Sequence, residues 1–172
     1  GMVHAMSPDA TTSIIMAGHA GNSACWITDK TGKWASSTYY TELPTTIQQL
    51  NHLRPLAARL DTIRWTPTLP DGAYSELPSH KKIYSFNHTF AGGDAERYAR
   101  YKMSAPVNSE VTSVSIDFLK ALSMGKREPV DMLELNYTLQ PYTYSNQPDT
   151  RVELLDSYLR LDRDLARLFA TI

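Results

Sequence analysis

The chain has 172 residues, 42% of them hydrophobic and 20% charged, with a formal net charge of -1 at pH 7. This length suits a single domain with a real core rather than two domains. The near-neutral charge offers no electrostatic basis for binding nucleic acid. The single cysteine excludes a disulfide within the chain, and no apolar run approaches the ~20 residues of a membrane span.

The first predicted element is a buried strand over residues 11–16, a short run of β-branched and apolar side chains. Pro8 precedes the run and Gly18 follows it, and both residue types commonly interrupt regular secondary structure. We therefore expect the sheet to begin here.

A β-hairpin is predicted next. Residues 23–28 form an apolar run, residues 29–32 form a turn that ends in glycine, and residues 33–37 return with alternating polarity. We expect Trp26 and Trp34 to pair across the two strands and cover an edge of the core. Cys25 lies inside the first of these strands and is expected to be a small core residue rather than a nucleophile.

A helix is predicted from Pro44, because proline suits a first turn and Ile47 and Leu50 follow at helical spacing. Pro55 should end or kink it. Residues 65–93 then form the longest irregular stretch, which we interpret as an insertion that is functional or packs on another part of the protein. A short helix over residues 94–102 follows.

The last third of the chain alternates helix, strand and helix. Asn108 and Ser109 are predicted to cap a helix that ends near Gly125, and residues 131–138 alternate as a strand. Residues 150–153 form the pattern of a capping box before a helix that runs to Phe169. These elements predict a layered α/β fold, with a small mixed sheet, flanking helices and an aromatic hairpin.

On the last helix, Asp162 is expected on the apolar side, where a carboxylate needs a partner. Arg160 or Arg163 would supply it through an ion pair. Histidines 52, 80 and 88 show no spacing typical of a metal site.

Several stretches carry a resemblance to a known family. They are Ala17-Gly18-His19, Thr31-Gly32-Lys33-Trp34, Ser36-Ser37-Thr38-Tyr39-Tyr40, Glu42-Leu43-Pro44 and the helical run 156–166. On these stretches the chain resembles the alkaline-phosphatase superfamily, in the type I phosphodiesterase/nucleotide pyrophosphatase branch that includes secreted bacterial phosphatases. The match covers most of the chain in order.

The resemblance implies a two-zinc phosphate-ester hydrolase. Six His and Asp ligands would hold the ions, a Thr or Ser would be the nucleophile, and a Lys/Arg pair would clamp the phosphate. The clamp would fall within residues 7–12, which contain no Lys or Arg, and one pair of ligands within residues 139–144, which contain no Asp or His. We therefore assign no catalytic residue, no metal ligand and no cofactor to this chain.

Five residues are retained as candidates for lining a ligand cleft: His19, Asn22, Gln140, Tyr142 and Tyr144. For His19 the structural alternative is a turn histidine that makes one hydrogen bond. The tyrosines are equally plausible as interior residues or as part of a former interface.

Three functions follow. The chain could be an inner piece of an active hydrolase, a degenerate pseudo-phosphatase that binds a ligand or partner, or a free-standing interaction domain. The missing clamp and ligand residues favour a protein that has no turnover by itself. It would be organised as one domain over residues 1–172 or as a fragment of a larger one.

We expect an exposed apolar face that further segments or a homo-oligomer would cover. The resemblance implies a periplasmic or secreted protein, although no leader with a basic and an apolar region is recognisable.

Overall fold

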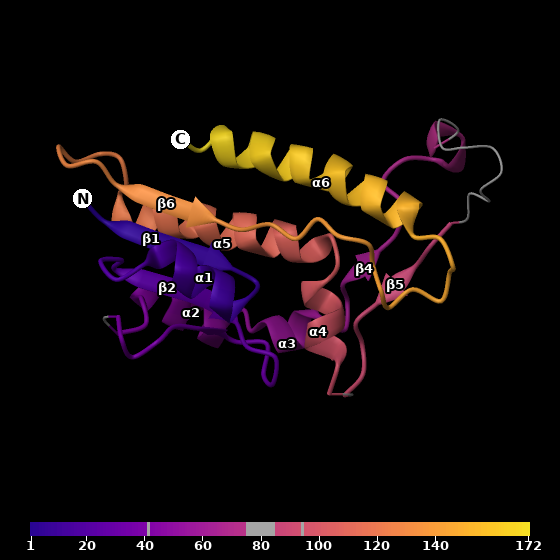
Figure 1. Ribbon diagram of the computed structural model, residues 1–172, viewed down its shortest axis with the longest axis horizontal. Helices are drawn as coiled ribbons and strands as arrows, with labels where there is room; N and C mark the ends of the chain where they lie inside the picture. Colours follow the sequence, from indigo (N-terminus) through magenta and orange to yellow (C-terminus); the bar gives the residue numbers. More distant parts are fainter. Residues whose placement is uncertain (41, 75–84, 94) are drawn as a thin grey trace.

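A mixed sheet of four strands lies at the centre of the computed structural model, which describes residues 1–40, 42–74, 85–93 and 95–172 (Figure 1). The strand order is β3-β2-β1-β6. β1 (Val3–Ser7), β2 (Ser23–Ile27) and β6 (Met132–Leu135) are parallel, and β3 (Trp34–Ala35) is antiparallel to β2. The predicted α/β class with a small mixed sheet is confirmed.

α1 (Ala10–Ala17) covers one face of this sheet, and α2 (Thr45–Leu53) and α5 (Pro106–Leu122) cover the other. The other described helices are α3 (Leu56–Arg59), α4 (Arg97–Lys102) and α6 (Arg151–Phe169). α6 packs on the outer side of α5, and both run along the same face of the sheet (Figure 1). No helix in the described ranges is long and apolar enough to cross a membrane.

The two faces of the sheet bury different kinds of side chain. On the α1 face, Ala5, Ala17 and Ala24 form a small cluster, so the helix lies close to the strands. On the α5 face, Met6 and Cys25 join the main core, in which the indole of Trp34 is also buried. Alternation along each strand produces this division.

The first predicted strand is wrong, because residues 11–16 lie in α1. Asp9 caps this helix, with its Oδ2 accepting the N–H of Thr12 at 2.7 Å. The true first strand, β1, was not predicted. Since β1 and β2 are parallel, the chain between them must cross back over the sheet, and that requirement favours helix over the strand propensity of the run.

The hairpin is confirmed, but its aromatic pairing is wrong. Ile27 lies opposite Trp34, and Trp26 lies opposite Ala35. The two tryptophans therefore point to opposite faces of the sheet, Trp34 into the main core and Trp26 toward the α1 face. A shift of one residue in strand register moves every side chain of that strand to the opposite face of the sheet.

Two predicted caps also differ from the structure. α5 begins at Pro106, so Asn108 lies inside the helix, and its amide instead binds the backbone of Thr138 through both its nitrogen and its oxygen. Thr150 precedes α6 without a side-chain cap bond. The capping box fails because Glu153 turns into the core.

The predicted insertion at residues 65–93 is partly described. β4 (Arg64–Trp65) pairs with β5 (His88–Thr89), and a 3-10 turn η1 (Asp71–Tyr74) lies between them. His80 lies outside the described residues. The helices predicted after Pro44 and within residues 94–102 are confirmed as α2 and α4.

Candidate functional site

The carboxyl ends of β1, β2 and β6 meet at one edge of the sheet, where ligands of parallel sheets commonly bind. Ser7 ends β1, and its hydroxyl accepts the N–H of Asp9 at 3.0 Å and the side-chain amide of Asn136 at 3.1 Å. This serine therefore ties the loop after β1 to the loop after β6.

Asp9 is one of two acidic groups that line the hollow at this edge. Its carboxylate accepts the backbone N–H and the hydroxyl of Thr12, at 2.7 and 2.9 Å. The backbone bond from Thr12 is the main cause that holds the pKa of Asp9 below its ordinary value. Its role is to cap α1.

Lys102 is the cation of the same edge. Its Nζ lies 2.6 Å from Asp29 Oδ1 and donates to the carbonyl of Ile27 at 3.3 Å. A hollow of about 450 Å³ lies beside this pair. Its lining residues are Asp9, Ala10, Trp26, Ile27, Thr28, Asp29, Lys30, Thr31 and Lys102.

The five cleft candidates do not come together. His19 and Asn22 lie before β2, at the amino edge of the sheet, whereas Gln140, Tyr142 and Tyr144 follow β6 at the carboxyl edge. One cleft cannot contain both groups, because the length of the strands separates them.

At the amino edge, the two candidates make structural contacts. The ring of His19 lies against Tyr39, with Nδ1 3.2 Å from the phenol oxygen, beside a hollow of about 430 Å³ that Ile14 and Ile15 also line. The side-chain oxygen of Asn22 accepts the N–H of Val3 at 2.8 Å.

At the carboxyl edge, Tyr142 is a core residue. Its ring packs against Trp65 and His88 with centroids 5.1 and 4.6 Å apart, and burial raises its pKa to about 12. Gln140 is exposed, and its amide contacts the sulfur of Met103. Tyr144 is partly exposed beside Tyr142.

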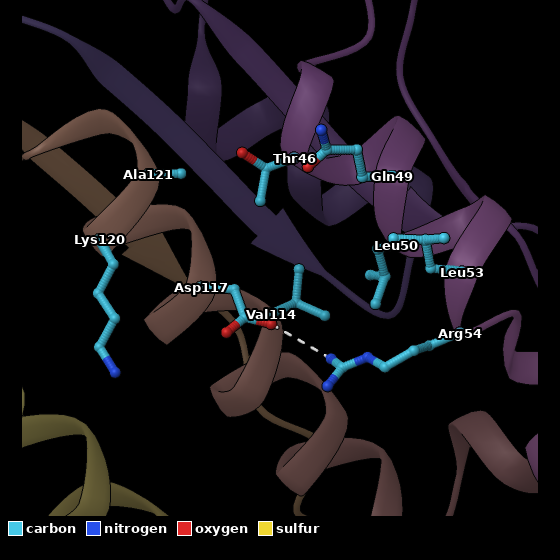
Figure 2. A pocket seen from close by; sticks show the side chains of 9 residues that line it. All are labelled: Thr46, Gln49, Leu50, Leu53, Arg54, Val114, Asp117, Lys120 and Ala121. Atoms are coloured by element: carbon cyan, nitrogen blue, oxygen red, sulfur yellow. Dashed lines mark hydrogen bonds and ion pairs between the residues drawn. The ribbon is translucent and has the colours of Figure 1, made fainter.

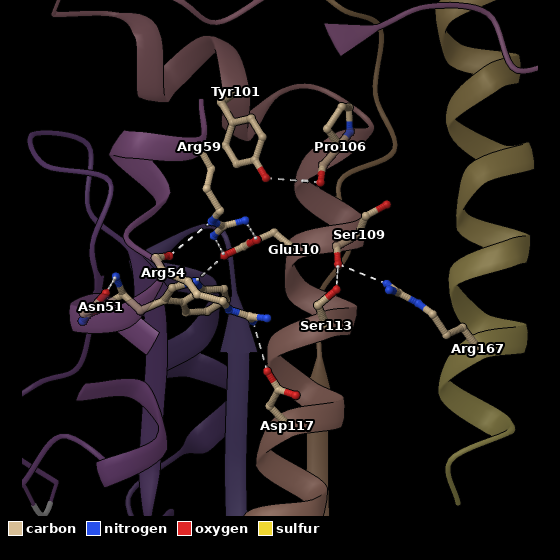
Figure 3. A network of polar contacts seen from close by, with 11 residues as sticks. Asn51, Arg54, Arg59, Tyr101, Pro106, Ser109, Glu110, Ser113, Asp117 and Arg167 are labelled. Carbon is tan, nitrogen blue, oxygen red and sulfur yellow. Dashed lines mark hydrogen bonds and ion pairs between the residues drawn. The ribbon is translucent and has the colours of Figure 1, made fainter. Parts of the chain in front are cut away.

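Sequence reasoning missed four buried carboxylates among the described residues, Glu110, Glu153, Asp156 and Asp164. Glu110 accepts a two-pronged ion pair from Arg59, at 2.7 and 2.9 Å, and a bond from the indole of Trp34 (Figure 3). Glu153 Oε1 binds His88. Asp156 is completely buried. Each of these groups has a hydrogen-bond partner far away in the sequence, and helical spacing carries no signal for such a contact.

Asp162, the carboxylate predicted to need a partner, is exposed. Arg160 does form an ion pair, but with Asp156, at 2.6 Å. The predicted ion pair of Arg160 is therefore present, but its acid is Asp156 rather than Asp162.

A shallow groove separates α2 from α5 (Figure 2). Arg54 and Asp117 form an ion pair across it at 3.2 Å, with both side chains about half exposed. Such a solvated pair holds the helices only weakly. The groove shows no buried reactive group.

Among the described residues, no three His, Cys, Asp or Glu side chains lie close enough to share a metal ion. The candidates that follow β6 are an amide and two phenols, which are poor zinc ligands. The described residues therefore do not fit a zinc centre.

The fold matches part of the solved structures of one enzyme. A crystal structure of wild-type alkaline phosphatase PafA superposes with a TM-score of 0.73 and 28% identity, covering 99% of this chain and 35% of that one. A PafA mutant gives a TM-score of 0.74 at the same identity. The chain resembles part of an alkaline phosphatase.

Curated sequences agree with this alkaline-phosphatase resemblance. Alkaline phosphatase PafA of Elizabethkingia meningoseptica is 33% identical over 169 residues, and alkaline phosphatase PhoV of Synechococcus elongatus is 30% identical over 174. A calcium-transporting ATPase of Myroides odoratus is 27% identical over 176. The match covers 91% of this chain but only about 30% of each relative. No protein-family model matches the sequence.

Proposed function

We propose that this chain is a segment of an alkaline-phosphatase-like hydrolase fold, of the phosphodiesterase/nucleotide pyrophosphatase kind, that has no zinc-dependent turnover by itself. The parent protein would act on phosphate esters in the periplasm or outside the cell. The relatives named alkaline phosphatase support the reaction class. The residue losses support the absence of turnover.

One observation carries the proposal: the segments expected to hold the clamp and one pair of ligands contain no suitable cation, Asp or His, and two of their side chains make structural contacts instead. Asp9, the only charged residue of residues 7–12, is used to cap α1. Tyr142, in the loop expected to hold metal ligands, is packed into the aromatic core. The carboxylate of Asp9 would repel a phosphate, and the phenol of Tyr142 is a poor zinc ligand.

The proposed lack of zinc-dependent turnover is tested by measuring zinc content and phosphate-ester hydrolysis together on the zinc-loaded chain. We expect no stoichiometric zinc and no turnover of phosphate monoesters or diesters, with PafA assayed in parallel as the positive control. Turnover that scales with one or two bound zinc ions would overturn the proposal.

The second candidate is a pseudo-phosphatase that still binds an anion at the carboxyl edge of the sheet. The hollow beside Lys102 favours it, because the partly buried ammonium of Lys102, paired with Asp29, lines the same hollow as the first turn of α1. Inorganic phosphate is the probe, and the Lys102→Gln variant should lose any binding while Lys33→Gln, at an exposed position, should retain it. Binding unaffected by Lys102→Gln would exclude this site.

We also propose that further polypeptide covers the free edge of β6 in the assembled protein. β6 pairs with β1 on one side only in the described structure. Beside it, Met132, Phe169 and Ile172 are 50–85% exposed, an apolar surface typical of a covered face. The relatives, about three times longer than the matched region, contain the chain needed to cover it.

Amide hydrogen exchange tests the covering of β6. The N–H groups of Met132 and Asn136 bind β1, so those of Leu133 and Leu135 point to the free edge. We expect these two amides to exchange fast in the 172-residue chain and slowly in the natural gene product. Equal rates in both proteins would contradict the covering.

A further inference from the structure

The hollow of about 430 Å³ beside His19 lies at the carboxyl end of α1, and we call it the tyrosine hollow. It is formed where the last turn of this helix meets the segment of residues 36–40 that follows β3. Its lining residues are Ile14, Ile15, Gly18, His19, Ser37, Tyr39 and Tyr40. Aromatic rings and isoleucine side chains therefore make up most of its wall.

Two tyrosine rings form adjoining walls of the tyrosine hollow. The ring planes of Tyr39 and Tyr40 stand at 86° to each other, with centroids 5.1 Å apart, and the ring of His19 lies at 66° to that of Tyr39. Tyr39 is 63% exposed, so a ligand in the hollow has access to its ring. Rings at these angles surround one small group from more than one side, whereas stacked rings would offer it a single face.

Hydrogen bonds hold both tyrosine rings in place. The hydroxyl of Tyr40 donates to the carbonyl of Gly18 at 2.9 Å, which ties this ring to the end of α1. The hydroxyl of Tyr39 lies 3.2 Å from Nδ1 of His19. Because the rings are already ordered, a ligand that binds between them would cost little side-chain entropy.

The end of α1 supplies a partial negative charge. Gly18 follows the helix and donates its N–H to the carbonyl of Ile14, and no basic side chain lies in the last turn. The carbonyl end of a helix favours a cation, and so do the faces of aromatic rings. The described lining of the tyrosine hollow contains no Lys or Arg that would repel one.

The same described lining contains no carboxylate, and this selects the kind of cation. A primary ammonium is strongly hydrated and needs hydrogen-bond acceptors when it leaves water. A quaternary ammonium has no N–H to satisfy, and its methyl groups pack against aromatic faces. Ile14 and Ile15, 41% and 73% exposed, add apolar surface for these methyl groups.

We propose that the tyrosine hollow binds the trimethylammonium group of a small ligand of the choline type. The cation contacts the rings of Tyr39 and Tyr40, and its methyl groups pack against the isoleucines of α1. The inference is independent of the proposed hydrolase ancestry, because it uses none of the residues at the carboxyl edge of the sheet.

An NMR titration of the nitrogen-15-labelled 172-residue chain tests the proposal. Choline chloride is compared with 3,3-dimethylbutan-1-ol, which has the same shape without the charge, and sodium chloride controls for ionic strength. We expect choline to shift the amides of Gly18, His19 and Tyr39 and to bind about fivefold more tightly than the neutral alcohol, the size of a cation–π contact. Equal binding of the two would mean an apolar hollow only, and no shift specific to choline would mean no site. Either result would overturn the proposal.

Substitutions at Tyr39 test the contribution of its ring. Tyr39→Leu should weaken choline binding about fivefold, whereas Tyr39→Phe should keep it within about twofold, because the ring is retained. Tyr158→Leu, at a tyrosine that is 53% exposed on α6, is the matched control and should bind as the wild type does. Undiminished binding by folded Tyr39→Leu would overturn the proposal.

A charge placed in the wall tests the sign of the ligand. Ile15 is 73% exposed on a helix, so a long polar side chain is compatible with the fold there. Ile15→Lys should lower choline affinity about threefold or more relative to the neutral control Ile15→Gln, and should leave binding of 3,3-dimethylbutan-1-ol unchanged. Equal choline binding by these two variants would contradict a cation site.

Discussion

Asp156 Oδ2 accepts the indole N–H of Trp65 at 2.7 Å, across 91 residues of sequence. The same carboxylate accepts the N–H of Thr68 at 2.6 Å and pairs with Arg160. One fully buried acid therefore fixes the start of α6 to the irregular stretch that follows β4.

Replacing this acid should destabilise the protein strongly. Asp156→Ala leaves Arg160 and the Trp65 indole without their partner, so we expect a loss of about 3 kcal/mol in the free energy of unfolding. Urea denaturation followed by circular dichroism measures it. Asp162→Ala, on the exposed side of the same helix, should change the value by less than about 0.5 kcal/mol. Equal losses would contradict the assignment.

Glycine is required at position 32. Gly32 adopts φ +64, and a Cβ there would meet the ring of Tyr98. Gly32→Ala should therefore cost more than about 1 kcal/mol. Gly93→Ala, where a Cβ would have no neighbour within 4 Å, is the control and should be nearly neutral. A Gly32→Ala melting temperature equal to that of the control would show that the turn can relax.

Cys25 should be unreactive in the folded protein. Its side chain is completely buried, and burial raises its pKa to about 11, so little thiolate exists at pH 8. A disulfide reagent such as dithionitrobenzoate should label the thiol only after urea is added. Labelling of the native chain at the rate of free cysteine would disprove this.

Asp131 should give the stability a dependence on acid pH. The N–H groups of Met2 and Gly125 donate to its carboxylate at 2.8 and 3.0 Å, and they lower its pKa from 3.8 to about 2. The charged form is favoured in the folded state, so its contribution is complete above about pH 4 and is lost as the pH falls toward 2. The difference in unfolding free energy between wild type and Asp131→Asn should shrink over that range. A difference that stays constant from pH 5 to about 2.5 would contradict the shift.

Local patterns predicted much of this fold. Helical spacing located α2 and α5, the glycine turn located the hairpin, and proline marked the start of α2. Propensity failed at residues 11–16, because the need to connect two parallel strands decided their conformation. The buried carboxylates Glu110, Glu153 and Asp156 were missed for a related reason: each has a partner far away in the sequence, namely Arg59, His88 and Trp65 in that order.

The candidate site was predicted less well. His19 and Tyr142 were grouped as possible cleft residues from their residue types, yet they lie at opposite edges of the sheet. Tyr39 and Tyr40 were not considered as ligand-binding residues, because the strand predicted over residues 11–16 concealed the helix that ends beside them.

The pairing of β1 with two distant strands sets an order for its folding during synthesis. β2 follows β1 closely in the sequence and pairs with it. The carboxylate that accepts the N–H of Met2 belongs to Asp131, which is 129 residues further along the chain. At ~5–20 residues per second, a ribosome needs roughly ten seconds to deliver β6. For that interval the second edge of β1 has no strand beside it, and an uncovered edge of this kind is a template for pairing with another chain.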